Sequence, residues 1–217
     1  MKIIPAILAE HFDDFLLKLR QSESFTDYVE IDLMDGIFVP TRSFDLQRIN
    51  GIDTSLSFQI HVMARDPVRF LSQVTHPNLK TVIFHFESPV DPGDITKRIH
   101  DRGLEAGLAI NPETEIDQFK NAAFAADLLQ FLTVDPGNYG KPFRHEVLKK
   151  ISEAKRLFPK KLISVDGGVS LENMNSFFDI GVDHVCIGSR IFLTGDPAEN
   201  YRSFVERVKE LEKIIAK

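Results

Sequence analysis

The sequence predicts an α/β protein folded as a single-domain (β/α)8 TIM barrel, and three observations carry this prediction. Eight short apolar or β-branched runs recur along the 217 residues. A charged, amphipathic stretch follows each run, which is the alternation that βα units produce. Eight units leave about 27 residues each, enough for a strand and a helix with short loops. No Pro- or Ser-rich linker divides the chain, so we expect one domain over residues 1–217.

The apolar runs are short and continuous, which is typical of parallel strands that are buried on both faces. The predicted strands are 2–8, 28–33, 57–62, 81–86, 105–110, 127–134, 162–166 and 184–188. The competing architecture is an open doubly wound sheet. No Gly-x-Gly-x-x-Gly motif follows the first run, where such sheets often bind a dinucleotide, so the closed barrel is favoured.

The segments between the runs have the periodicity of amphipathic helices. One apolar face of a predicted helix over 11–20 is formed by Phe12, Phe15, Leu16 and Leu19. Asp66-Pro67 and Asp196-Pro197 each combine a capping side chain with a proline suited to the first helical position. Both pairs therefore predict the start of a helix.

Composition excludes several classes of protein. The chain carries 26 Lys+Arg against 32 Asp+Glu, a formal charge of −6, which argues against a nucleic-acid partner. The single cysteine, Cys186, cannot form an internal disulfide, which favours a reducing compartment. No apolar run approaches the ~20 residues of a membrane span, and the N-terminus lacks the pattern of a signal peptide. We therefore expect a cytoplasmic protein without a membrane partner.

Ionisable residues end several of the predicted strands, at the edge where barrels of this class place their active sites. Burying such groups is costly unless they are paired, bound to metal or catalytic. Glu30, Asp32, His61 and Asp166 form a set of oxygen and nitrogen donors that could hold a divalent metal. Asp32 and Asp166 come from opposite sides of the barrel, as a two-base proton transfer requires. Taken singly, a histidine is more often a satisfied core residue, and Asp-Gly is ordinary turn chemistry.

Glycines follow the last three predicted strands, where this fold commonly binds phosphate through backbone N–H groups. The residues are Gly137, Gly140, Gly167, Gly168, Gly188 and Ser189. Three ordinary turns are the simpler alternative. Their position on three consecutive strand ends favours a phosphate site, which an acidic net charge does not exclude.

At these residues the sequence resembles the ribulose-phosphate 3-epimerase family over nearly the whole chain. The most specific segment is 32–40, which is similar to the family's D-x-M-D-G-x-F-V-P string. Further similar segments are His61-Val62-Met63, Phe84-His85-Phe86-Glu87, residues 107–114 (G-L-A-I-N-P-E-T), residues 133–137 (T-V-D-P-G) and residues 165–169 (V-D-G-G-V).

The resemblance implies an isomerase of carbohydrate metabolism, in the pentose phosphate pathway, that interconverts ribulose 5-phosphate and xylulose 5-phosphate. It implies that Asp32 and Asp166 are the two acid/base residues at C3, and that Met34 and Met63 shield the intermediate. Glu30, Asp32, His61 and Asp166 would hold the metal, which the donor types leave open among Zn, Mn, Fe, Co and Mg. His61 and the six phosphate-site residues above would bind the substrate. The resemblance is also compatible with a homo-oligomer.

The chain departs from the family at the site itself. The family has a metal-binding histidine where this chain has Glu30, and a harder set of three carboxylates should favour Mn, Fe or Mg over Zn. The alternative is that Glu30 is not a ligand and that the site binds no metal. Ala6 replaces a serine, Leu132 replaces a methionine, and Tyr139 enters a glycine-rich loop. A divergent epimerase with an altered sugar phosphate and a non-catalytic sugar-phosphate-binding barrel both remain open. A related decarboxylase is disfavoured, because Met34 stands where its lysine is expected.

Overall fold

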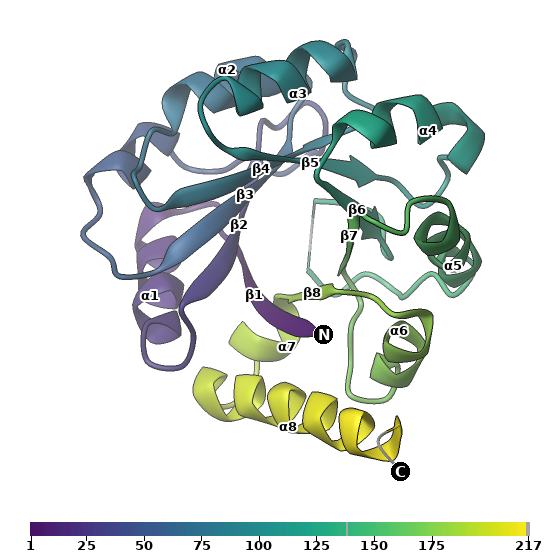
Figure 1. Cartoon of the computed structure of the whole chain (residues 1–217). Helices are drawn as coiled ribbons and strands as arrows, with labels where there is room; N and C mark the ends of the chain where they lie inside the picture. The colour runs from purple at the N-terminus through teal and green to yellow at the C-terminus, as the bar shows by residue number, and fades with distance from the viewer. Residues whose placement is uncertain (138, 216–217) are drawn as a thin grey trace.

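Eight parallel strands close into a barrel in chain order in the computed structural model, which describes residues 1–137 and 139–215 (Figure 1). The strands are β1 (Lys2–Leu8), β2 (Tyr28–Met34), β3 (Ser57–Met63), β4 (Leu79–His85), β5 (Glu105–Ile110), β6 (Leu128–Leu132), β7 (Leu162–Asp166) and β8 (His184–Ile187). β8 pairs with β1 and so closes the ring. The predicted (β/α)8 fold is confirmed, whereas the extent of one domain over 1–217 stays a prediction.

A ring of helices surrounds the barrel (Figure 1). It contains α1 (Phe12–Ser22), α2 (Pro67–Gln73), α3 (Pro92–His100), α4 (Ile116–Ala125), α5 (Val147–Leu157), α6 (Met174–Ile180) and α8 (Pro197–Ile215). Two short helices, η1 (Leu46–Gly51) and α7 (Ser189–Phe192), lie in the connections after β2 and β8. Within residues 1–137 and 139–215, no helix is long and apolar enough to cross a membrane.

The predicted Asp-Pro helix starts are confirmed. The Asp66 side chain accepts a hydrogen bond from the Arg69 N–H, and the Asp196 side chain accepts one from the Glu199 N–H. Asp91 caps α3 in the same way, with Pro92 in its first turn. In each case the carboxylate satisfies an N–H that the helix itself leaves unpaired.

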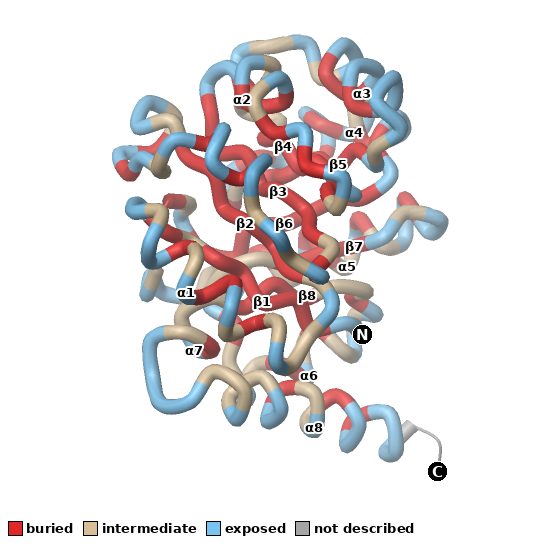
Figure 2. Tube along the Cα trace, turned by 90° about the vertical axis from the view of Figure 1, so that its left-hand side faces the viewer, coloured by how far each residue is buried: buried red, intermediate tan, exposed pale blue. Residues whose placement is uncertain are grey.

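The core has two parts. The larger part lies between strands and helices and contains fully buried phenylalanines such as Phe15, Phe84 and Phe177, which fill the space in a chain without Trp. Small apolar clusters inside the barrel include Ile83 with Leu128, and Cys186 with Ala6. Figure 2 shows the buried strands at the centre and the exposed outer sides of the helices. The barrel therefore holds its inward side chains in a packed, water-poor interior.

We expect Phe84→Ala to lower the free energy of unfolding by about 3–5 kcal/mol, because it removes a fully buried ring from the layer between strands and helices. Phe124→Ala is the matched control, since this ring is 67% exposed and should cost less than about 1 kcal/mol. Urea denaturation followed by circular dichroism measures both. An equal loss of unfolding free energy in the two variants would contradict the assignment of Phe84 to the buried core and Phe124 to the surface.

Candidate functional site

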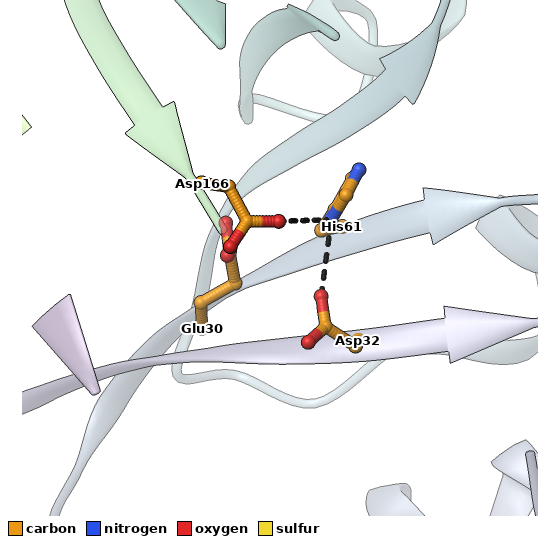
Figure 3. A group of neighbouring side chains, drawn as sticks. All are labelled: Glu30, Asp32, His61 and Asp166. Carbon is orange, nitrogen blue, oxygen red and sulfur yellow. Dashed lines mark hydrogen bonds and ion pairs between the residues drawn. The ribbon is translucent and has the colours of Figure 1, made fainter. Parts of the chain in front are cut away.

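The ionisable side chains predicted from the strand ends meet inside the barrel (Figure 3). Glu30 and Asp32 lie two residues apart on β2 and so point to the same side, and Asp32 pairs in register with His61 on β3. Asp166 joins them from β7, which is separated from β2 by β1 and β8. One potential ligand atom from each of the four side chains lies within 4.8 Å of the others.

His61 links the two aspartates. Its Nδ1 is 3.0 Å from Asp32 Oδ1 and 3.5 Å from Asp166 Oδ2. Burial opposes protonation of the ring, but the hydrogen bond to Asp32 and the charges of Glu30, Asp32 and Asp166 outweigh it. Together they raise the pKa of His61 to about 9. Without a metal the ring therefore favours its protonated form, which offsets part of the carboxylate charge, whereas a metal ion on Nδ1 would take the place of that proton.

A second histidine fixes the orientation of the first. His61 Nε2 is 2.9 Å from His85 Nε2, and His85 Nδ1 is 3.2 Å from Glu87 Oε2. Burial lowers the pKa of His85 to about 4, so this ring is neutral and carries one N–H. Glu87 accepts that N–H, which leaves His85 Nε2 to accept from His61 Nε2–H. His61 Nδ1 is thereby directed at the aspartates.

Glu87, which orients His85, is itself held in place by hydrogen bonds from the loop after β5. Its Oε1 accepts hydrogen bonds from the Asn111 N–H and the Thr114 hydroxyl. Lys150 Nζ donates to the backbone oxygens of Asn111 and Thr114, which fixes the same loop. The sequence assigned no role to His85 and Glu87, although both stand in a segment quoted above for its family resemblance, residues 84–87. Their part is to orient His61.

Glu30 is completely buried, and its two carboxylate oxygens differ. Oε2 accepts hydrogen bonds from Gln59 Nε2 at 2.7 Å and from Gln130 Nε2 at 3.1 Å. Oε1 has no hydrogen-bond partner. Burial raises the pKa of Glu30, an effect that the positive charge of His61 opposes. Burial and the charges of Glu30 and Asp32 also raise the pKa of Asp166 well above its usual range.

These residues fit a divalent cation. A buried polar atom without a partner is rare in folded proteins, and Glu30 Oε1 is such an atom at the edge of a crowded group of carboxylates. A cation would satisfy this oxygen and relieve the repulsion among three acids. The donor set of carboxylate oxygens and one imidazole nitrogen is one that divalent metals accept.

All six predicted phosphate-site residues line one cavity together with Asp32, Asp166 and Met63. The cavity has a volume of about 50 Å³. A side chain at Gly167 would place its Cβ 2.3 Å from Val134 Cγ2, and the φ of +98° there also requires glycine. Met34 does not line this cavity but packs against Met63 and Val39. The structure thus brings the predicted reaction and phosphate groups to one place.

Tyr139 ties the loop after β6 to β1, a contact that sequence reasoning missed. Its hydroxyl donates to the Ala6 carbonyl oxygen and accepts from the Leu8 N–H, both at 2.9 Å. A side chain at Gly188 would meet the Tyr139 ring at 2.3 Å, so the ring lies directly on this glycine. Ala6 and Tyr139, two positions at which the chain departs from the family pattern, are therefore in contact. Residue 138 lies outside the described residues.

We expect His85 to remain neutral, with its proton on Nδ1, between about pH 5 and pH 8, because its pKa is lowered to about 4. Long-range ¹H–¹⁵N spectra of the histidine rings report both the charge and the tautomer. The ring of His100, which is paired with Asp127 at the surface, serves as an internal reference in the same spectra. A His85 ring that is protonated at pH 6 would contradict the orientation assigned to His61.

Comparison with known proteins identifies relatives along most of the chain. The sequence model of the "Ribulose-phosphate 3 epimerase family" matches residues 2–192. The ribulose-phosphate 3-epimerase of Schizosaccharomyces pombe is 27% identical over 204 residues, which cover 91% of this chain and 90% of that protein. The ribulose-phosphate 3-epimerase of Bacillus subtilis is 29% identical, with 90% and 94% covered. These matches confirm the family resemblance predicted from the motifs.

Solved structures also match the barrel. The 3-hexulose-6-phosphate synthase of Salmonella typhimurium superposes with a TM-score of 0.73 at 16% identity, covering 97% of this chain and all of that one. The orotidine 5'-monophosphate decarboxylase of Sulfolobus solfataricus gives a TM-score of 0.64 at 15% identity, covering 96% and 98%. At these identities the similarity establishes the fold alone.

Proposed function

Because the chain belongs to the ribulose-phosphate 3-epimerase family, we propose that it epimerises ribulose 5-phosphate and xylulose 5-phosphate at C3. The family is one of isomerases, which confirms the predicted class of enzyme. One observation carries the proposal. The carboxyl groups of Asp32 and Asp166 line the same cavity as the glycines predicted to bind phosphate, so one sugar phosphate could contact both.

The reaction needs two acid/base groups on opposite faces of C3. The C3 proton lies next to the C2 carbonyl, so its removal gives an enediolate, and a proton delivered to the other face inverts the centre. Asp32 and Asp166 reach the cavity from β2 and β7, and three steps around the barrel separate these strands. Burial and the neighbouring carboxylates raise the pKa of Asp166, which supports the role of this carboxyl group as a proton donor at C3. In the reverse direction the two roles exchange.

Glu30, Asp32, His61 and Asp166 would hold the divalent metal. When bound, the metal supplies a Lewis acid that offsets the negative charge developing on the substrate oxygens. Three carboxylates and one imidazole form a hard donor set, for which we propose Mn²⁺, Fe²⁺ or Mg²⁺ ahead of Zn²⁺ and Co²⁺. The chain's own contribution is to fix these donors, through His85 for His61 and through two glutamines for Glu30.

The remaining groups bind and enclose the substrate. Met63 lines the cavity, and Met34 packs behind it, so together they would form an apolar wall that keeps water from the reacting carbon. A pentulose phosphate needs far more room than about 50 Å³. Substrate entry therefore requires the Tyr139 side chain to leave its hydrogen bonds with Ala6 and Leu8.

Asp166→Asn should lower turnover by about 10²–10⁴-fold, because the amide cannot exchange a proton with C3. Each sugar phosphate is incubated with enzyme in heavy water, and loss of the C3 proton signal is followed by NMR. Asp179→Asn makes the same change at an exposed site and should retain full exchange. Exchange at the wild-type rate in Asp166→Asn would rule out the two-aspartate mechanism.

A second candidate, a non-catalytic sugar-phosphate-binding barrel, is favoured by one observation. The Tyr139 ring lies on Gly188 and occupies space beside the predicted phosphate site. The same heavy-water experiment separates the two functions. Binding of the sugar phosphates by wild-type protein, without C3 exchange at any added metal, would support the non-catalytic barrel and exclude the epimerase.

Removal of divalent metal should abolish C3 exchange, and Mn²⁺ should restore it better than Zn²⁺, because the donor set is rich in carboxylates. The protein is treated with a chelator, shown to be metal-free by elemental analysis, and then assayed with each ion. Chelator-treated protein that is carried through the same steps without added metal is the control. Full exchange by the metal-free protein would contradict the metal's role.

A further inference from the structure

A polar layer lies inside the barrel around Glu30. Gln59 is the register neighbour of Glu30 on β3, and Gln130 reaches the same carboxylate from β6. Both amides are buried, with exposed fractions of 1% and 0%. Buried amides among apolar strands are costly unless each polar atom finds a partner, so their contacts show what the layer is built to hold.

Both glutamines donate to the same atom. Gln59 Nε2 lies 2.7 Å and Gln130 Nε2 lies 3.1 Å from Glu30 Oε2, while Glu30 Oε1 accepts no hydrogen bond. Two donors that arrive from different strands fix the plane of the carboxylate as well as its position. They also occupy Oε2, so Oε1 is the oxygen that remains for a cation.

The orientation of each amide is itself fixed. The Tyr28 hydroxyl donates to Gln59 Oε1 at 3.3 Å, and the Ser164 hydroxyl donates to Gln130 Oε1 at 3.0 Å. Rotating either amide by 180° would bring its oxygen against the Glu30 carboxylate, where two acceptors would repel each other. Two chains of donors, Tyr28–Gln59 and Ser164–Gln130, therefore both end on Glu30 Oε2.

We propose that Gln59 and Gln130 are positioning residues that hold Glu30 as a one-oxygen ligand, through Oε1, for the divalent cation of the site. The inference rests on the proposed function in one respect, because it requires that the site binds a metal. It goes beyond that function by assigning two residues outside the ligand set to the control of metal affinity. Groups that orient a metal ligand typically contribute 10–100-fold to affinity.

The test uses Gln59→Met and Gln130→Met, singly and together, because Met has nearly the volume of Gln but no N–H donor. Mn²⁺ is titrated into chelator-treated protein by calorimetry, and Co²⁺ binding is followed by visible absorption as a second readout. Each single variant should bind Mn²⁺ about 10–100-fold more weakly than wild type, and the double variant more weakly still. Changed Co²⁺ absorption is expected as Glu30 becomes free to reorient.

Ser22→Ala is the matched control. Ser22 is fully buried, and its hydroxyl donates to the Lys18 carbonyl oxygen within α1, with no contact to the Tyr28–Gln59 or Ser164–Gln130 chains. It should lose stability without losing Mn²⁺ affinity. Gln59→Asn and Gln130→Asn keep an amide that is one methylene too short to reach Glu30, and they replace any Met variant that fails to fold. Thermal melting establishes that each variant is folded before titration.

The Mn²⁺ affinities and the C3 exchange together test the positioning role of Gln59 and Gln130 separately from the epimerase activity. Wild-type Mn²⁺ affinity in folded Gln59 and Gln130 variants would overturn the inference and leave the epimerase intact. Wild-type protein that exchanges the C3 proton but binds neither Mn²⁺ nor Co²⁺ would also overturn it. Weakened binding in the variants, with no C3 exchange in wild type, would support the inference while the proposed function failed.

Discussion

The structure depends on one electrostatic constraint, which is three carboxylates and a histidine held within 4.8 Å at the end of a packed barrel. In a water-poor interior such charges repel strongly and lose their hydration, so each needs a compensating partner. A proton on His61 Nδ1 supplies one compensation, and a bound cation, which would replace that proton, would supply a larger one. His85, Gln59 and Gln130 orient these residues, and the cavity lined by the glycine-rich loops reaches them at Asp32 and Asp166.

Much of the fold could be predicted because parallel strands buried on both faces leave continuous apolar runs in the sequence. β1, β5 and β7 coincide with their predicted ranges, and each end of the other strands lies within two residues of its predicted place. β6 ends at Leu132, two residues before its apolar run does, and the next residue, Thr133, donates its hydroxyl to the Gly167 carbonyl oxygen after β7. The helix α7 was not predicted, since four residues are too few to show a helical period.

The ligand cluster could be predicted because the carboxyl ends of parallel strands meet at one edge of a barrel. The residues that orient the ligands or cover the cavity could not be predicted from the sequence. His61 and His85 touch through the rotamers of two neighbouring strands, and Tyr139 meets Ala6 across 133 residues of sequence. Gln130 lies 100 residues from Glu30. Such contacts depend on register and packing, for which a single sequence carries no direct signal.

The glutamate at position 30 fits its surroundings as a carboxylate and not as a neutral replacement for an imidazole. A metal-bound imidazole donates its second N–H and needs an acceptor behind it. Here the Tyr28 and Ser164 hydroxyls donate to the two amides, and both amides donate onward to Glu30. With both amides in their present orientation, a ring N–H in this place would face two NH₂ groups. The polar layer, as it is oriented here, is thus matched to a hydrogen-bond acceptor at position 30, which is what the Glu30 carboxylate supplies.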